Sequence, residues 1–458
     1  MKKESQYKIS PYLLVLISFA LVIIIGSILL TLPFAHTDGK WGNVLESVFN
    51  ATSATCVTGL TNYEAGIGNE LTLFGQIVML IMIQIGGLSF ITILSFIVTI
   101  FQRRLKFKDR LFLSQAVNSN TIAQVARYVR RVIVIVIIFE SLGFLLGLPV
   151  FLNLPDVPIG KALWMDLFTS VSAFNNAGFD LFGNTSLIRG IGNVYIDAMP
   201  EWAYYYMLSY IMFLIVSGGI SFLVIIDIFV VRRRPRQWTA FTKIILLTTA
   251  ILIVFGFGVF FLTDVLNGSI NPFQALFQSI TTRTAGFAAH DQNSMSSAGK
   301  MFSCLLMFIG GSPIGTAGGI KTTTIFIIVL SFIRFIQGRQ IVAFKRQYSR
   351  ISIIKAMSLV FLSIIIILSA FVAIISIEKG NSDATTENVF FEVFSAFGTT
   401  GLSANLTTTL QPASQIILCF LMFFGRLGPI TMFQIFQQKM DKEESKHFKY
   451  ITTDVIIG

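Results

Sequence analysis

The sequence predicts an all-α integral membrane protein, in which four tandem helix–pore-helix–helix repeats place eight transmembrane helices around one central pore. Composition, a motif that recurs four times and short half-polar segments between long apolar ones predict this fold. Of the 458 residues, 54% are hydrophobic and 12% are charged, and the mean hydropathy is +0.76. Water-soluble domains do not have this composition, so we expect the chain to cross a membrane several times.

A glycine follows a short polar run and precedes Leu or Phe at four places in the chain. The runs are TSATCVTGL, SAFNNAGF, TTRTAGF and SAFGTTGL, and they contain Gly59, Gly178, Gly286 and Gly401. These glycines lie 119, 108 and 115 residues apart, which indicates one structural unit used four times. A helix C-cap is the common use of any single glycine of this kind, but the shared flanks favour a shared function.

Eight segments are long and apolar enough to cross a bilayer, which takes about 20 apolar residues. They are 11–33, 71–101, 129–152, 203–231, 240–263, 300–335, 355–377 and 412–437. A shorter half-polar segment lies inside each pair, at 43–52, 160–173, 271–281 and 386–396, and is predicted to be a re-entrant pore helix. The repeats are therefore assigned to 1–102, 103–231, 232–336 and 337–458, the last with a cytoplasmic C-terminal tail.

The net charge of +11 comes from clusters of Lys and Arg that lie between apolar spans. This arrangement orients a membrane protein and does not indicate a nucleic-acid partner. The clusters at 103–131, 232–243 and 334–355, and the basic termini, are predicted to be cytoplasmic. All four repeats then have the same orientation, which favours a pore. An alternating-access secondary transporter or symporter for sodium or non-selective monovalent cations is the alternative, although such transporters often contain inverted repeats.

The polar run after each pore helix has to line water or protein, because its unpaired backbone groups cannot face lipid. A glycine there can turn carbonyl oxygens toward a shared axis, and a ring of carbonyls replaces the hydration shell of K⁺. We expect backbone carbonyls to bind the ion, and Arg283 to point away from the pore and hold neighbouring backbone. The predicted filter comprises Thr55, Cys56, Val57, Thr58, Gly59, Asn175, Asn176, Ala177, Gly178, Arg283, Thr284, Ala285, Gly286, Gly398, Thr399, Thr400 and Gly401. Asn175 and Asn176 are expected to brace a turn, although their amides could also face the ion.

The span 300–335 contains six Gly or Pro residues within ten positions, so a continuous helix is not expected there. A simple kink is one interpretation, and an intramembrane gating loop at 310–322 below the filter is the other. Arg426 is expected to donate hydrogen bonds to carbonyls of this loop, with snorkelling to the interface as the alternative. The predicted gate comprises Gly310, Gly311, Ser312, Gly315, Thr316, Ala317, Gly318, Gly319, Lys321 and Arg426.

Two segments, TRTAGF at 282–287 and GGSPIGTAGGIKT at 310–322, resemble the Trk, Ktr and HKT superfamily of potassium transporters, and the membrane subunit of its Ktr branch in particular. The resemblance covers nearly the whole chain. It implies selectivity for K⁺ over Na⁺, because Gly59 stands where a serine is associated with sodium transport, and it leaves Na⁺ dependence open. It also implies a homodimer in the bacterial plasma membrane, surrounded by lipid, and a cytoplasmic KtrA-type regulatory ring.

Enzymatic function is not expected, because the chain has no paired carboxylates, nucleophile with base, or metal cluster placed for catalysis. Three cysteines and three histidines are too few and too scattered for a disulfide framework or a zinc site. Neither a P-loop nor a GxGxxG segment after a strand is present. We therefore expect no covalently bound cofactor, and any ATP or ADP to bind to the regulatory partner and not to this chain.

Overall fold

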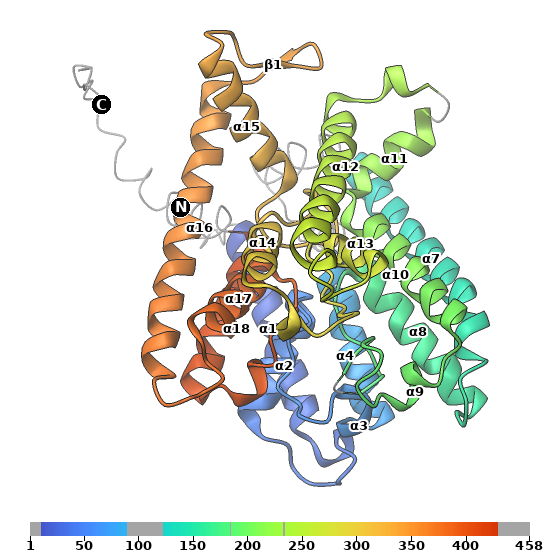
Figure 1. The fold of residues 1–458 in the computed structure, drawn as a ribbon. Helices are drawn as coiled ribbons and strands as arrows, with labels where there is room; N and C mark the ends of the chain where they lie inside the picture. Colours follow the sequence, from blue (N-terminus) through green and yellow to red (C-terminus); the bar gives the residue numbers. More distant parts are fainter. Residues whose placement is uncertain (1–10, 89–121, 184, 232–233, 429–458) are drawn as a thin grey trace, which may run out of the picture.

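The computed structural model describes residues 11–88, 122–183, 185–231 and 234–428, and in this part the chain is mostly helical (Figure 1). This confirms the prediction of a mostly helical chain with several apolar helices. The predicted end of the span 71–101, most of the basic cluster 103–131, both termini and the C-terminal tail lie outside the described residues.

Fourteen helices make up the core of the described structure. Ten of them, 10 to 30 residues long, correspond to the predicted spans and are called the long helices, and four, 10 to 17 residues long, correspond to the predicted pore helices and are called the short helices. The long helices are α1 (Pro11–Thr31), α4 (Leu73–Gly87), α7 (Ile122–Phe151), α10 (Glu201–Gly219), α11 (Phe222–Val231), α12 (Ala240–Phe260), α14 (Ser297–Phe308), α15 (Thr322–Ile336), α16 (Arg350–Ile377) and α18 (Pro412–Leu427). The four short helices are α2 (Val44–Cys56), α8 (Ile159–Asn175), α13 (Pro272–Thr281) and α17 (Thr386–Gly398).

Several helices begin at a residue whose side chain accepts a hydrogen bond from the first turn. The Asn43 side chain caps α2, Thr239 caps α12, Ser349 caps α16 and Thr385 caps α17. Such caps satisfy amides that have no partner inside the helix. They fix where each polar loop ends and each apolar helix starts.

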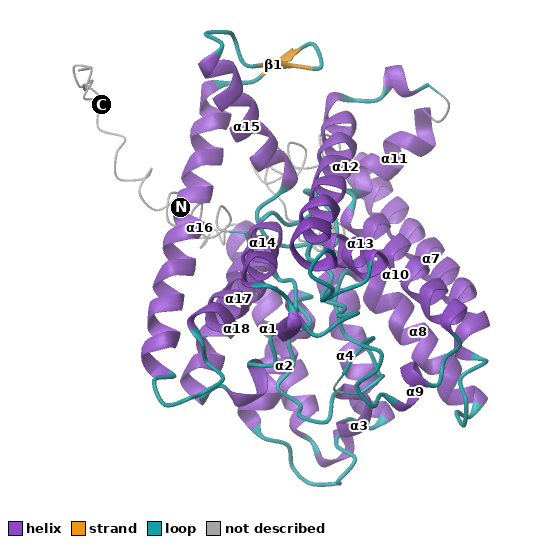
Figure 2. Cartoon of the chain, in the orientation of Figure 1, coloured by secondary structure: helices purple, strands orange, loops and turns teal. Residues whose placement is uncertain are grey.

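Loops between these helices contain only small elements (Figure 2). These are α3 (Ile67–Glu70), α9 (Val194–Asp197), single turns of 3₁₀-helix at Pro33–Ala35, Pro235–Gln237, Gln292–Ser294 and Thr407–Thr409, a π-helical turn at Phe261–Val265, and a hairpin of β1 (Val342–Ala343) and β2 (Arg346–Gln347). The hairpin pairs Val342 with Gln347 and Ala343 with Arg346 in antiparallel register.

Among the described helices, three are long and apolar enough to cross a membrane, namely Arg127–Phe151, Ala240–Val265 and Arg350–Ile377. A fourth span forms if α10 and α11 are taken together, and five apolar helices are shorter. The prediction of one continuous helix over 203–231 is wrong: α10 and α11 meet at an angle of 94°. The break falls at Ile220 and Ser221, directly after Gly218 and Gly219, where two glycines weaken the helix.

Each short helix packs against long helices that flank it in the sequence. Contacts join α2 to α1 and α4, α8 to α7 and α10, α13 to α12, and α17 to α16 and α18. A second set of contacts joins each group to the next: α4 contacts α8, α10 contacts α13, α14 contacts α17, and α18 contacts α2. The last group therefore packs on the first, and the four groups close into a ring.

Candidate functional site: the four glycine segments

A three-residue segment with positive φ at its first and last residues lies directly after α2, α8 and α17, and two residues beyond the end of α13. We call 57–59, 176–178, 284–286 and 399–401 the glycine segments. Each begins with a residue other than glycine at positive φ, namely Val57 (56°), Asn176 (58°), Thr284 (69°) and Thr399 (51°), and each ends with a glycine at positive φ, between 72° and 101°. Left-handed backbone is strained for β-branched residues, and such strain concentrates at functional sites.

The glycines are not the C-caps of the short helices. In α2, α8 and α17 the cap is the residue two positions earlier, at Val57, Asn176 and Thr399. The helix therefore ends before the glycine is reached, and the helix-cap interpretation of the glycines is wrong.

Four predicted filter residues lie elsewhere than expected. Thr55 and Cys56 form the last turn of α2, Asn175 is the last residue of α8, and Gly398 is the last residue of α17. Helices α2, α8 and α17 extend two to four residues further than their sequence limits, because polar and small residues are compatible with a buried helix end, whereas α13 ends at Thr281 as predicted. These four residues support the glycine segments from within the helices.

Serine hydroxyls hold the glycine segments in place, and the sequence analysis missed them. The Ser53 hydroxyl accepts a hydrogen bond from the Gly59 amide (3.2 Å), and the Ser395 hydroxyl accepts one from the Gly401 amide (3.0 Å). The Ser172 hydroxyl accepts one from the Phe179 amide (3.0 Å). The available signal was a serine six residues before the glycine in three of the four runs.

The carbonyl oxygens of the glycine segments remain without donors. Backbone amides of the segments bond back to their helix, as Thr58 does to the Ser53 carbonyl (2.8 Å) and Thr400 does to the Ser395 carbonyl (2.8 Å). No described residue donates a hydrogen bond to a carbonyl of the glycine segments. Buried carbonyls without donors are rare in proteins, so these oxygens are free to bind a cation.

The four glycines lie side by side in cyclic order. A Cβ added to Gly59 would lie 2.6 Å from the Ala177 carbonyl oxygen, and one on Gly178 would lie 2.7 Å from that of Ala285. A Cβ on Gly286 would lie 2.3 Å from the Thr400 oxygen, and one on Gly401 would lie 2.1 Å from the Thr58 oxygen. Each glycine thus faces the carbonyl that precedes the glycine of the next segment. Only a residue without a side chain fits at these four positions.

A cavity of about 320 Å³ adjoins the ring of glycines. The residues that follow each glycine line it, together with Glu64, Asp180, His290 and Asp291. Burial raises the pKa of Asp180 to about 6 and lowers the pKa of His290 to about 4, so the histidine is neutral at pH 7. The cavity therefore presents carboxylates and no histidine cation near the ring.

Two other acidic residues of the short helices do not face this cavity. Asp166, in the middle of α8, is fully buried, and a Cβ on Gly147 of α7 would lie 1.9 Å from its Oδ1. Glu392, in α17, is 1% exposed and accepts a hydrogen bond from Thr407. They connect the short helices to neighbouring elements.

The loop between α14 and α15, residues 309–321, lies on the other side of the ring. A Cβ on Gly318 would lie 2.0 Å from the Thr399 hydroxyl, and one on Gly319 would lie 3.3 Å from the Gly398 carbonyl. Ile309 and Ile320 pair as a parallel bridge, which brings the two ends of the loop together. The loop thus contacts the residues that precede the glycine, whereas the cavity contacts those that follow it.

This loop docks on the bend between α10 and α11. The Ser312 amide donates to the Gly219 carbonyl (3.1 Å), and the Thr316 amide donates to the Gly218 carbonyl (3.2 Å). In return, the Phe222 amide donates to the Ile314 carbonyl (3.1 Å). The 309–321 loop therefore binds to the bend between α10 and α11, which the sequence did not predict.

Two cations bond to the loop, the buried Arg426 of α18 and the half-buried Lys321 at the end of the loop. Arg426, 8% exposed, donates from one guanidinium nitrogen to the Thr316 carbonyl and from another to the Gly86 carbonyl. Lys321 donates from Nζ to the Ala317 carbonyl (2.7 Å). Arg426 therefore joins the loop to the end of α4.

A second glycine recurs in the helix after the first, second and fourth segments, and it was not predicted to have this role. Gly86, Gly218 and Gly425 each lie against the carbonyl four residues before a segment glycine, where a Cβ would lie 2.1, 1.7 and 1.9 Å from the oxygens of Thr55, Phe174 and Phe397. The signal was the pair Gly86–Gly87, repeated as Gly218–Gly219 and Gly310–Gly311. In the fourth case the second glycine is replaced by Arg426.

Asn175 and Arg283, which each stand three residues before a segment glycine, have side chains that point away from the ring. Asn175 donates from Nδ2 to Glu140 of α7 (2.9 Å) and to Gln84 of α4 (3.1 Å), so its side chain joins helices and does not face the ring. Arg283 is 8% exposed and lines a small cavity with residues of α10 and α12. No hydrogen bond joins its side chain to a described residue, and its Nε is buried without an acceptor there, so the hold on neighbouring backbone stays a prediction.

Strained, closely packed backbone with free carbonyls, in a chain of apolar helices, is the arrangement expected of a membrane protein that transports cations. Sequence comparison gives the family: the chain matches TrkH, described as "Cation transport protein", over residues 4–448. The chain belongs to this family, which consists of transporters and not of enzymes.

Individual relatives cover almost the whole chain. The chain is 32% identical to the potassium/sodium uptake protein NtpJ of Enterococcus hirae, over 100% of this chain and 99% of that protein. It is 34% identical to the Ktr system potassium uptake protein B of Bacillus subtilis, over 98% and 97% of the two chains. These relatives confirm the resemblance to the Trk and Ktr proteins.

A solved structure has a similar fold. The potassium transporter TrkH of Vibrio parahaemolyticus aligns with a TM-score of 0.70 and 16% identity, over 95% of this chain and 86% of that chain.

Proposed function

We propose that this chain is the membrane subunit of a Ktr-type (KtrB-like) system and takes up K⁺ across the plasma membrane of a bacterium. The ion passes through a selectivity filter that consists of the four glycine segments. The observation that carries the proposal is the cyclic packing of the four glycines, each against the carbonyl that precedes the next. Carbonyl oxygens turned to one axis replace the water around a monovalent cation.

The four-repeat, eight-span architecture belongs to this proposal. Contacts between each group of helices and the next, closing from α18 back to α2, support a single central pathway. In an alternating-access transporter with inverted repeats, equivalent groups would be related by opposite orientations. Here the four short helices all end at the ring of glycines, which favours a pore.

The 309–321 loop is proposed to gate this pathway. It lies on one side of the filter and the 320 Å³ cavity on the other, so the cavity is the outer vestibule and the loop obstructs the inner side. Arg426 holds the loop through Thr316 and ties it to Gly86. Removing these bonds is expected to favour an open pathway.

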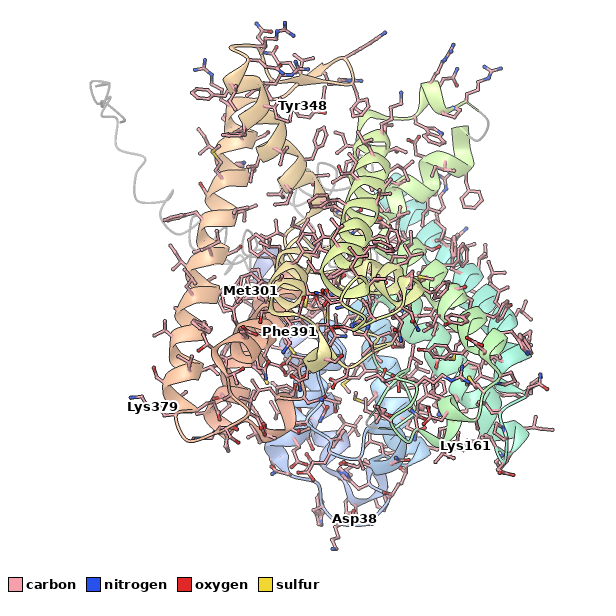
Figure 3. All side chains as sticks on the ribbon, in the orientation of Figure 1. Asp38, Lys161, Met301, Tyr348, Lys379 and Phe391 are labelled. Carbon is pink, nitrogen blue, oxygen red and sulfur yellow. The ribbon has the colours of Figure 1, made fainter. Side chains whose placement is uncertain are left out.

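We assign the cytoplasmic side to the end of the molecule that carries Tyr348 and the β1–β2 hairpin. Tyr348 lies at the opposite end from Asp38 (Figure 3). Exposed basic residues gather on this end, namely Arg339, Lys345, Arg346 and Arg350, as the positive-inside rule requires. Both termini are then cytoplasmic, and the basic surface is the proposed docking site for a KtrA-type ring that binds ATP or ADP. The name of the Bacillus subtilis relative supports such a multi-component system.

Large apolar side chains face outward on the long helices, including Val254 (70% exposed) on α12 and Phe361 (69%) on α16. Lipid covers most of this surface in the proposed assembly, and a second copy of the chain covers the rest in a homodimer. Exposed apolar area of this kind is stable only in contact with lipid or protein.

Sodium is the second candidate ion, because one relative is named as a potassium/sodium uptake protein. Uptake of K⁺ and Na⁺ into a potassium-uptake-deficient bacterium that expresses this chain with a KtrA-type partner tests the proposal. Wild type should rescue growth at low K⁺, and Gly59→Ser and Gly286→Ser should lose rescue or admit Na⁺. Rescue and selectivity that survive both substitutions would contradict the filter and favour a sodium or non-selective cation symporter with its site elsewhere.

A further inference from the structure

Arg283 is a buried cation that finds no hydrogen-bond acceptor in the described part of the chain. Its side chain is 8% exposed, and its Nε is buried without an acceptor among these residues. No described residue accepts a hydrogen bond from its guanidinium. Guanidinium groups carry five N–H donors and stay charged in proteins, and an unpartnered charge at membrane depth is costly. A hydrogen-bond acceptor for the guanidinium in another conformation of the protein would offset this free-energy cost.

The surroundings of Arg283 show where that partner lies. Arg283 lines a cavity of about 10 Å³ together with Gly219 at the end of α10, Gly311 at the start of the 309–321 loop, and Thr249 of α12. The Thr249 hydroxyl also has no hydrogen-bond partner within the described ranges. The equivalent residue of the second repeat, Asn175, instead has Glu140 and Gln84 as acceptors. Arg283 therefore stands beside the place where the loop docks on α10.

The docking bonds occupy the carbonyl of Gly219, which lines this cavity, and that of its neighbour Gly218. Gly219 and Gly218 accept from the amides of Ser312 and Thr316 in the conformation described. If the loop withdraws, both carbonyls lose their donors, and α10 has already ended, so no helical amide replaces them. Buried carbonyls without a donor destabilise the withdrawn state. Arg283 supplies free donors beside Gly219.

We propose that Arg283 is a positioning residue for gating: it donates to the Gly219 carbonyl when the 309–321 loop leaves the bend between α10 and α11, and so stabilises the open state. This inference rests on the proposed gating role of the loop. Arg426 acts in the opposite sense, because it bonds to the loop in the docked state. The two arginines are then latches for two positions of one loop.

The test measures K⁺ and Na⁺ flux in proteoliposomes for Arg283→Met, which keeps the length of the side chain and removes its donors. We expect flux to fall at least fivefold and the ratio of K⁺ to Na⁺ flux to stay unchanged. Arg283→Lys, which keeps a charged donor, should retain a larger share of the flux. Arg189→Met is the matched control, because Arg189 donates to the Met199 carbonyl in an outer loop and should leave flux unchanged.

Arg426→Gln separates failure of this inference from failure of the proposed gate. If Arg426→Gln leaves flux unchanged, the gate itself is wrong. If Arg426→Gln raises flux and Arg283→Met leaves it unchanged or raises it, only the open-state latch is wrong. A changed K⁺ to Na⁺ ratio in Arg283→Met would assign Arg283 to the filter and also overturn the inference. Should Arg283→Met fail to fold, Arg283→Gln takes its place, and flux equal to wild type overturns the proposal.

Discussion

Substitution of Gly286 by alanine tests the carbonyl ring most directly. Gly286 has φ of 81°, and a Cβ there would lie 2.3 Å from the Thr400 carbonyl oxygen. Contacts of a Cβ shorter than 3.0 Å do not occur in practice, so this oxygen has to retreat by about 0.7 Å. The oxygen belongs to a rigid ring, because the Thr400 amide and the Gly401 amide are both held by Ser395.

Two free-energy terms oppose Gly286→Ala. Left-handed backbone costs an L-residue about 1–2 kcal/mol, and displacement of the carbonyl removes ion coordination on top of that. We expect K⁺ uptake to fall at least tenfold, which corresponds to about 1.4 kcal/mol in the transport barrier, and selectivity over Na⁺ to weaken. Flux of both ions into proteoliposomes, with the melting temperature of the purified protein, measures the two effects.

Gly268→Ala is the control for backbone strain alone. Gly268 has φ of 75°, close to that of Gly286, but no atom lies within 4 Å of its added Cβ. Gly268→Ala should lower the free energy of unfolding by a similar 1–2 kcal/mol and leave K⁺ uptake and selectivity intact. Wild-type selectivity in Gly286→Ala would refute the reasoning, since a displaced carbonyl cannot belong to a filter that still discriminates.

Three further changes test the supports of the ring and its vestibule. Ser395→Ala leaves the Gly401 amide without its acceptor, which should cost about 1–3 kcal/mol of stability and increase Na⁺ flux; an unchanged melting temperature and selectivity would contradict this role. Because the pKa of Asp180 is raised to about 6, its carboxylate is charged at pH 7.5 and largely neutral at pH 5, so apparent K⁺ affinity should fall about twofold over this range of external pH, as expected for one charge in a high-dielectric vestibule. Asp180→Asn should abolish this pH dependence of the apparent K⁺ affinity. A pH dependence that persists in the variant would show that another group causes it. Gly218→Ala, whose Cβ would lie 1.7 Å from the Phe174 carbonyl, should lower uptake more than tenfold, whereas Gly258→Ala, with open space around it, should not.

Regularities that repeat along the chain were predictable from the sequence. Gly59, Gly178, Gly286 and Gly401 share flanks and spacing, and repetition distinguishes a functional glycine from an ordinary helix cap. The helical character of the long segments follows from their apolar length. The break inside 300–335 follows from the density of Gly and Pro between Gly310 and Gly319.

Features that depend on tertiary contacts were not predictable in the same way. The ends of α2, α8 and α17 were placed too early, because Thr55, Asn175 and Gly398 have weak helix propensity and their helical state is set by burial. The bend after Gly219 was missed because two glycines in a membrane helix do not require a break. The Arg283 environment depends on α10, α12 and the 309–321 loop, which are distant in the sequence.

Asymmetry among the four repeats explains why a pathway built from repeated parts can still be regulated. At the second of the paired glycines, the first three repeats keep Gly87, Gly219 and Gly311, and the fourth has Arg426. In three repeats the glycine leaves room for a neighbouring side chain, that of Asn175 at Gly87, Asn176 at Gly219 and Ala317 at Gly311. The fourth repeat supplies a cation that reaches both Gly86 and Thr316. Selectivity requires four equivalent carbonyl segments, whereas a gate requires one repeat to differ from its neighbours. The chain meets both requirements because the position at which the fourth repeat differs, Arg426, lies outside the four segment glycines.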